Sequence, residues 1–533
     1  MIVSLIPILL LFVLMLGFKV SSHLSAFITL IATVVLALFV APPLDMFPDY
    51  GDGASTGAVV GWAVVEGVLK AIFPILIIIL MAIFSYNVLL ESRQIEVIKK
   101  QFMSFTDEKG VLVLMMVWGF GGLLEGMAGF GTAVAIPAAI LIGLGFKPVF
   151  SALVALLGNT VATGFGAVGV PVTTLCNEIT PGGVASAAVV REISTYTVLQ
   201  LSPLFVLVPF VILMLTDRKV WLRNAALAVW TGGISLIVQY ICAARLGAET
   251  PAIIGSIAAI AAIVVFARIF PVHKGAAAVA ADGAGVNVRV QEGAENGRSR
   301  FTIGQTLRAW SVYIFILVFI LLTGALCPPV EHFLKNTLVS KVPIPVIGTM
   351  FKFGWVSNAG LWLFLGSVLG GLVQGLGVTQ LARILARTLV NLRYTIITIV
   401  SLISLASVMN YSGMISSIAT GLVALTGSFY PFFAPLIGAV GTFVTGSDTS
   451  SNILFGKLQA SVAHQLGMSA QGADWLAASN TVGATGGKMI SPQSIAIATA
   501  ACDMTGKDDT ILRRAIPYAL CYIVIAGLIV YFG

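Results

Sequence analysis

The chain contains 533 residues, of which 58% are hydrophobic and only 10% are charged, and its mean hydropathy is +1.03. Soluble domains carry about a quarter charged residues, so the composition excludes a soluble globular protein and predicts an all-α polytopic protein in a lipid bilayer. The net charge is +7, but most basic residues lie in short loops, where they report topology rather than nucleic-acid binding.

The chain begins with MIVSLIPILLLFVLMLGFK, which predicts a transmembrane helix rather than a cleaved signal peptide, because a basic start and a small-residue cleavage site are absent. Stretches of about twenty apolar residues then predict about twelve transmembrane helices. Their approximate bounds are 2–18, 24–42, 59–90, 148–176, 192–215, 225–246, 251–270, 307–327, 355–376, 394–412, 474–502 and 515–532.

Two further regions, 110–145 and 432–467, each consist of two short apolar arms around a glycine- or serine-rich centre. Neither arm is long enough to cross a bilayer. We therefore expect two re-entrant helical hairpins, one in each half of the chain.

Basic loops orient the predicted helices. Placing the basic loops in the cytoplasm leaves both termini outside, and the residues concerned are Arg93, Lys99, Lys100, Lys109, Arg218, Lys219, Arg223, Arg383, Arg387, Arg393, Lys507, Arg513 and Arg514. The two hairpins then enter from opposite sides, so we expect the halves, 1–270 and 307–533, to be inverted repeats. The polar, small-residue-rich segment 271–306 is predicted to be a flexible cytoplasmic linker between them.

The tripeptide Asn-Thr-Val occurs once in each half, in the runs NTVATGFGAVGVP (from Asn159) and NTVGATGGKMISP (from Asn480). Glycine, proline and small hydroxyls inside an apolar helix predict a break, which lipid tolerates only where protein or a polar cavity satisfies the freed backbone groups. We thus expect broken helices over 148–176 and 474–502. Two such breaks in corresponding positions are typical of a secondary transporter.

Each predicted hairpin centre contains one carboxylate, Glu125 in GFGGLLEGMAGFGT and Asp448 in TGSDTSSNILFGK. An ionised carboxylate in the membrane interior is costly, so such a group can take up a proton. We expect both residues to couple transport to protons, with Asp448 the stronger candidate. Helix capping is the structural alternative. Small residues beside them, which let backbone amides approach a ligand, are candidate substrate contacts: Gly129, Gly131, Ser450 and Ser451.

Neutral donors and acceptors at the expected breaks complete the candidate site, namely Asn159, Thr160, Asn480 and Thr481. Half-helix N-termini there would attract an anion, although these residues can also simply cap their helices. Lys488 is the only basic residue of the second broken segment and is a candidate counter-charge, expected to pair with Asp448 in the same half. A lysine that reaches the membrane interface is the alternative.

The candidate substrate is one small monoanion. The stretches 94–190 and 394–512 contain no arginine, whereas arginine is preferred for bidentate carboxylate recognition. No catalytic triad, nucleotide loop, cofactor motif or metal-ligand spacing is visible, so we expect neither an enzyme nor a bound cofactor or metal.

Four runs together resemble the lactate permease family. They are GGLLEGMAGFGTAVAIPAAIL, GNTVATGFGAVGVPVTTL, FVTGSDTSSNILFG and SNTVGATGGKMISPQSIAIA. The resemblance implies proton-coupled uptake of lactate and related 2-hydroxymonocarboxylates such as glycolate across the bacterial inner membrane. More distantly, Ser479-Asn480-Thr481 resembles the substrate motif of the ion transporter superfamily, which implies an elevator-type motion and a homodimer.

Physical reasoning leaves two alternatives open. Moving an anion inward against a negative-inside potential costs about 2.3 kcal/mol per 100 mV, which either a co-transported proton or a sodium ion would offset. The hairpin carboxylates favour the proton, and a sodium-coupled dicarboxylate carrier is the alternative within the same class. A monocarboxylate channel is the other alternative, and it would require no titratable group.

Overall fold

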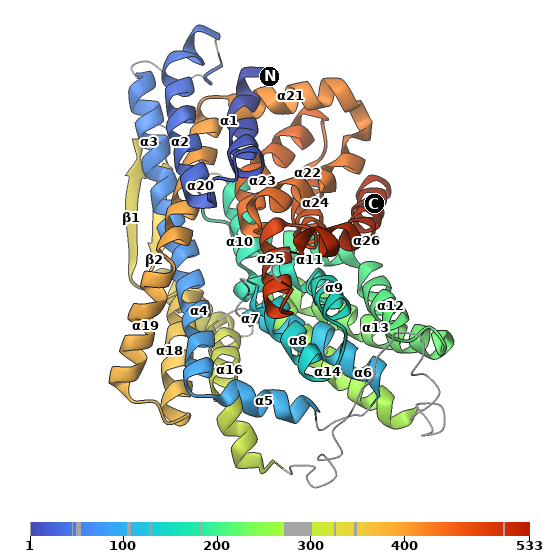
Figure 1. Ribbon diagram of the computed structural model, residues 1–533. Coiled ribbons are helices and arrows are strands. Elements are labelled where there is room, and N and C mark those ends of the chain that lie inside the picture. Colours follow the sequence, from blue (N-terminus) through green and yellow to red (C-terminus); the bar gives the residue numbers. More distant parts are fainter. Residues whose placement is uncertain are drawn as a thin grey trace.

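Helices make up nearly all of the chain, as its composition predicts (Figure 1). The computed structural model describes residues 2–44, 46–48, 55–103, 108–127, 129, 131–180, 183–270, 301–323, 327–345, 349–504 and 507–533. Most of the predicted linker 271–306 lies outside these residues. Its last residues are described, and a helix begins at Ile303.

The first half consists of helices alone in its described part. In chain order they are α1 (Ile2–Phe12), η1 (Val13–Gly17), α2 (Ser22–Phe39), η2 (Pro42–Leu44), α3 (Thr56–Lys70), η3 (Ala71–Leu76), α4 (Ile77–Glu91), α5 (Gln94–Met103), α6 (Lys109–Leu114), η4 (Met115–Phe120), α7 (Gly121–Met127), α8 (Thr132–Gly143), α9 (Pro148–Gly158), η5 (Val161–Phe165), α10 (Gly166–Ile179), α11 (Ala187–Leu201), α12 (Leu204–Thr216), α13 (Trp221–Leu246) and α14 (Pro251–Ile269).

The second half adds one β-hairpin to its helices. The elements are α16 (Ile303–Thr323), α17 (Pro328–Asn336), β1 (Val339–Ile344), β2 (Thr349–Gly354), α18 (Ala359–Val373), α19 (Val378–Asn391), α20 (Arg393–Tyr411), α21 (Met414–Thr426), η9 (Gly427–Phe429), α22 (Tyr430–Thr445), α23 (Asp448–Gln465), α24 (Ala470–Lys488), α25 (Pro492–Ala501) and α26 (Asp508–Phe532). β1 and β2 pair antiparallel, with Val339 opposite Gly354.

The number of membrane-crossing helices differs from the twelve that we expected. Nine helices of the described chain are long and apolar enough to span a membrane, or eleven if each of two bent pairs counts as one span. The expected span 474–502 is divided between α24 and α25, and the expected spans 2–18 and 355–376 correspond to shorter apolar helices, Ile2–Met15 and Ala359–Val373. Conversely, Lys109–Met127 and Met414–Thr445, which contain the first arms of the two expected hairpins, are long enough to cross a membrane, so the expectation that these arms are too short is wrong. Hydropathy alone does not show where an apolar stretch bends.

The helices form two groups in space. One, the side group, consists of α2, α3, α4, α16, α18, α19 and α20, which pack on one another at the left of Figure 1. The other, the core group, contains the two helix–turn–helix units α7–α8 and α22–α23 and the divided helices α9–α10 and α24–α25. Elements of the two chain halves interdigitate in the core group, because α8 contacts α25 and α10 contacts α23.

Buried charges join the two groups. Glu66 and Lys70 of α3 form an ion pair of 3.1 Å, and both side chains are almost fully buried. Lys70 also interacts electrostatically with Glu178 at the end of α10, and Lys457 of α23 interacts with the same three residues. Two acids and two bases thus balance one another where α3 meets the core group.

Glycines bring α22 and α24 into close contact. A Cβ atom on Gly483 would lie 1.7 Å from the carbonyl oxygen of Pro435, and one on Gly487 would lie 2.1 Å from that of Ala439. Small residues at helix interfaces in membranes permit such backbone approach. The position of α24 therefore depends on these two residues having no side chain.

Gly483→Ala should lower the thermal stability of the detergent-solubilised protein, because overpacking a tight interface costs roughly 1–3 kcal/mol or more. The matched control is Gly233→Ala in α13, where no atom lies within 4 Å of the added Cβ, and which should leave stability unchanged or slightly raised. Melting of both variants, followed by size-exclusion chromatography after heating, measures the effect. Equal melting temperatures would show that the α22–α24 contact is not tight.

Candidate functional site

A cavity of about 460 Å³ lies between the two helix–turn–helix units, where the core group meets the side group. Both turns line it, together with the start of α10, the end of α24 and the start of α25. The turn between α1 and α2 and the first residues of α20 complete the wall. We call this space the central cavity.

The turns that reach the central cavity are built on glycine. Gly129 and Gly131 between α7 and α8 have φ values of +61° and +85°, and Gly446 between α22 and α23 has a φ of +74°. This left-handed conformation is accessible to glycine without steric cost. The glycine- and serine-rich centres seen in the sequence are therefore what allows each arm to reverse direction inside the protein.

The first divided helix contributes a strained backbone to the cavity wall. η5 and α10 are bent by 47° from α9, and Ala167 and Val168 adopt left-handed φ values of +45° and +59°. Such conformations cost of order 1–3 kcal/mol each for residues other than glycine. Ala167 lines the cavity, so the strain lies at the candidate site, where surrounding packing holds it in place.

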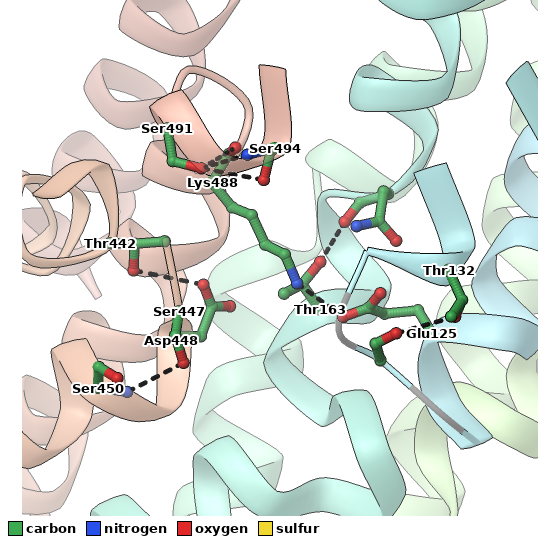
Figure 2. Close-up of polar contacts among 12 residues, drawn as sticks. Glu125, Thr132, Thr163, Thr442, Ser447, Asp448, Ser450, Lys488, Ser491 and Ser494 are labelled. Carbon is green, nitrogen blue, oxygen red and sulfur yellow. Dashed lines mark hydrogen bonds and ion pairs between the residues drawn. The ribbon is translucent and has the colours of Figure 1, made fainter. Parts of the chain in front are cut away.

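An ion pair crosses the cavity between the two halves of the chain (Figure 2). Lys488 Nζ donates to Glu125 Oε1 at 2.8 Å, and the two side chains are 11% and 2% exposed. Gly166 makes room for the carboxylate, because a Cβ there would lie 2.8 Å from Glu125 Oε1. We expected Lys488 to pair with Asp448, and the structure shows that this expectation is wrong: the end of α24 directs the lysine toward α7.

Asp448 is the second carboxylate of the cavity and has no cationic partner at hydrogen-bonding distance in the described structure. It begins α23, is 2% exposed, and accepts a hydrogen bond of 3.3 Å from the Thr442 hydroxyl through Oδ1. Its Oδ2 atom and Glu125 Oε2 are buried without a hydrogen-bond partner among the described residues. His23 also lines the cavity. With this histidine neutral and Glu125, Asp448 and Lys488 charged, the cavity carries a net charge of −1.

Helix N-termini add positive potential to this cavity. Lining residues lie at the beginning of α8, α10, α23 and α25. The N-terminal end of a helix presents free N–H groups and the positive end of its dipole, which favour an anion. Among the described residues, no group of three His, Cys, Asp or Glu side chains is placed to hold a metal ion.

Six residues that the sequence singled out line the cavity: Glu125, Gly129, Gly131, Asp448, Ser450 and Lys488. Asn480 and Thr481 do not, and they lie inside the continuous helix α24 rather than at a break. Asn480 donates to Asn452 Oδ1 at 2.9 Å, and Thr481 Oγ1 accepts from Asn452 at 2.9 Å. These side chains join α24 to α23 in this conformation.

The remaining predicted residues also lie outside the cavity wall. Ser451 donates to the Gly438 carbonyl at 2.7 Å, and Thr160 donates to the Leu157 carbonyl at 2.8 Å. Asn159 ends α9, and both polar atoms of its buried amide have no hydrogen-bond partner in the described part of the chain. Among the predicted residues that lie outside the cavity wall, Asn159 alone has a side chain without a hydrogen-bond partner in the described part of the chain.

Sequence reasoning missed several polar residues of the wall, including Thr163, Thr445, Ser447, Gln493 and Ser494. For Gln493 and Ser494 the sequence did contain a signal. Ser491-Pro492 is an N-cap followed by proline at the first helical position, a pattern typical of a helix start. It predicts a second helix after Lys488 whose first residues face the break.

Comparison with known proteins places the chain among permeases. The family described as L-lactate permease matches residues 1–533. The L-lactate permease of Streptococcus iniae is 37% identical over 485 residues, which cover 90% of this chain and 93% of that protein. The glycolate permease GlcA of Escherichia coli K12 is 33% identical over 556 residues, covering 99% of this chain and 94% of that protein.

A solved structure shares the fold. The YdaH transporter of Alcanivorax borkumensis superimposes with a TM-score of 0.50 over 95% of this chain and 97% of that one, at 13% sequence identity. At this identity the likeness concerns the arrangement of helices alone.

The contributions of Glu125 and Lys488 to stability should depend on each other, because the two side chains form one ion pair. Glu125→Gln or Lys488→Met alone should destabilise the protein by about 3–5 kcal/mol, because each leaves a buried charge uncompensated. The double variant should be more stable than either single variant. Thermal unfolding of all four proteins measures the coupling. The exposed pair Glu331–Lys335 is the control, for which we expect about 0–1 kcal/mol. Additive losses at Glu125 and Lys488 would contradict a direct interaction.

Asn480→Ala separates a binding role from a packing role. Loss of substrate affinity in a protein of normal stability would support the prediction that Asn480 contacts substrate in some conformation. A stability loss of about 1–3 kcal/mol from unsatisfied polar partners, with unchanged affinity, would assign the residue to packing alone. Binding by isothermal calorimetry and melting of the same preparation give both quantities.

Proposed function

This chain belongs to the L-lactate permease family, and we propose that it imports lactate and related 2-hydroxymonocarboxylates such as glycolate together with a proton. Membership in a permease family makes the protein a multi-pass membrane transporter rather than an enzyme. The observation that carries the proposal is the central cavity with one lysine, two carboxylates and several helix N-termini.

The charge of the cavity supports a small monoanionic substrate. Lys488 is the only lysine or arginine among the described residues that line it. One ammonium group and backbone N–H groups suit one carboxylate, whereas two or three carboxylates would call for arginine forks. Gly129, Gly131 and Ser450 line the same space. We therefore assign them, with Lys488, to substrate binding.

The two carboxylates support proton coupling. Adding a monoanion to a cavity of net charge −1 makes its net charge −2, which is strongly unfavourable in a buried site. One proton per substrate keeps the charge unchanged and makes transport electroneutral. Asp448 is the better proton carrier, because Lys488 is already paired with Glu125 and Asp448 has no such cation.

Lys488 can link the two binding events. In the empty site it neutralises Glu125, and an incoming substrate carboxylate competes for the same ammonium group. Protonation of Glu125 removes that competition, and protonation of Asp448 removes a negative charge that repels the substrate. Either event strengthens substrate binding, and by reciprocity substrate binding favours protonation. One shared cation is enough for this coupling.

The proposal includes the movement and location of the carrier. The basic loops support inverted halves in the bacterial inner membrane, with re-entrant hairpins whose tips meet at the cavity. We further propose an elevator-type displacement of the core group against the side group within a homodimer. Labelling of cysteines introduced at Thr132 and Ser450 from each side of the membrane tests the opposite insertion of the hairpins.

Two alternatives remain distinguishable by experiment. A sodium-coupled carrier of dicarboxylates would lose uptake when sodium is removed. A channel would show no counterflow, which is the exchange of labelled for unlabelled substrate without net flux. The two buried carboxylates and the lysine favour a proton over a sodium ion, and they have no evident purpose in a channel. The proton-coupled carrier is therefore favoured.

Asp448→Asn should abolish lactate accumulation driven by a pH gradient in proteoliposomes, while downhill exchange of labelled lactate continues. The amide keeps the size of the side chain but cannot carry the proton. Asp509→Asn, at an exposed position of α26, is the control and should behave like the wild type. If both Asp448→Asn and Glu125→Gln still accumulate lactate in response to the gradient, the coupling assignment is wrong.

A further inference from the structure

The short helix α25 touches the turns of both helix–turn–helix units. The Gln493 side chain lies against Gly446, where a Cβ atom would be 2.0 Å from Gln493 Oε1. One turn later the Ile497 side chain lies against Gly131, where a Cβ atom would be 2.4 Å from Ile497 Cδ1. All four residues line the central cavity. The helix α25, which carries Gln493, thus contacts the turns of both halves of the chain.

Gln493 differs chemically from the other polar residues of the wall. It is the only asparagine or glutamine among the described residues that line the cavity. Its side chain is exposed, and it makes no hydrogen bond with the described residues. An amide offers donors and an acceptor together, so it is free to bind a group that also donates and accepts.

Several neighbouring hydroxyl groups are already engaged. Thr445 donates to the Gly441 carbonyl at 2.8 Å, Ser447 accepts from the Ser450 backbone N–H at 3.3 Å, and Ser494 is bonded to the Ser491 hydroxyl at 2.9 Å. Using them for a ligand would require breaking bonds that cap or bend their own helices. The Gln493 amide carries no such cost.

We propose that Gln493 recognises the 2-hydroxyl group of the substrate and so determines specificity for 2-hydroxymonocarboxylates over simple fatty acids. The inference rests on the proposed function. Lys488 ends α24 and Gln493 is the second residue of α25, so the cation for the carboxylate and the amide for the adjacent hydroxyl flank the same three-residue break. A hydroxyl next to a carboxylate matches this arrangement.

The test compares acids that differ only by the hydroxyl group: lactate with propionate, and glycolate with acetate. For the wild type, kcat/KM should be higher for the hydroxy acid of each pair. Gln493→Met, which keeps the length of the side chain, should lower kcat/KM about tenfold for lactate and glycolate, as expected for one lost hydrogen bond. Values for propionate and acetate should change less than twofold, and this retained uptake shows that the variant is folded.

The control is Gln471→Met, at an exposed position in the first turn of α24 away from the cavity wall, which should leave all four values unchanged. A second variant, Gln493→Ala, should show the same loss of discrimination as Gln493→Met. Retained preference for lactate over propionate in both variants would overturn the inference. Loss of uptake of all four acids in both variants would also overturn it, because the residue would then not act on the hydroxyl.

The outcomes separate this inference from the function on which it rests. A wild-type protein that transports none of the four acids refutes the proposed function itself. A wild-type protein that transports lactate and propionate equally well leaves the monocarboxylate carrier standing and refutes recognition of the hydroxyl.

Discussion

The ion pair between Glu125 and Lys488 is the interaction on which the centre of this protein depends. Burying two charges costs several kcal/mol per ion unless their geometry and surroundings compensate, so the pair fixes how α7 of the first half faces α24 of the second. It requires the missing side chain at Gly166, because a Cβ atom there would lie 2.8 Å from Glu125 Oε1. It also leaves Asp448 with the Thr442 hydroxyl, and no cation, as its hydrogen-bonding partner among the described residues.

Much of this site was predictable because charge is rare in the chain. In an apolar sequence, Glu125, Asp448 and Lys488 stand out individually, and the glycines around them indicate sharp turns. The partner of Lys488 was not predictable, because residues 363 positions apart meet only through the packing of whole helices. For the same reason the sequence did not show which polar side chains would face the cavity. The β-hairpin was missed as well, since VSKVPI and TMFKFG are short segments between much longer apolar stretches.

The two Asn-Thr-Val runs are similar in sequence but differ in structure. In the first run the glycine Gly169 and its neighbours take left-handed conformations and bend the chain. In the second, Gly483 and Gly487 stay helical and accept the backbone of α22 instead. Glycine in an apolar helix permits both bending and close packing, and the local sequence does not decide between them. The break in the second half consequently lies after Lys488, and Asn480 becomes part of a helix interface.

The contacts of α25 impose a constraint on chain length. An α-helix turns by about 100° per residue, so one residue inserted or deleted between Gln493 and Ile497 would rotate one of these residues relative to the other, and they could no longer meet Gly446 and Gly131 together. Neither contact can be restored without disturbing the other, because Gln493 and Ile497 belong to the same short helix. Variation in length among proteins that share this architecture should therefore avoid residues 493–497, while substitutions that preserve the spacing remain open to selection.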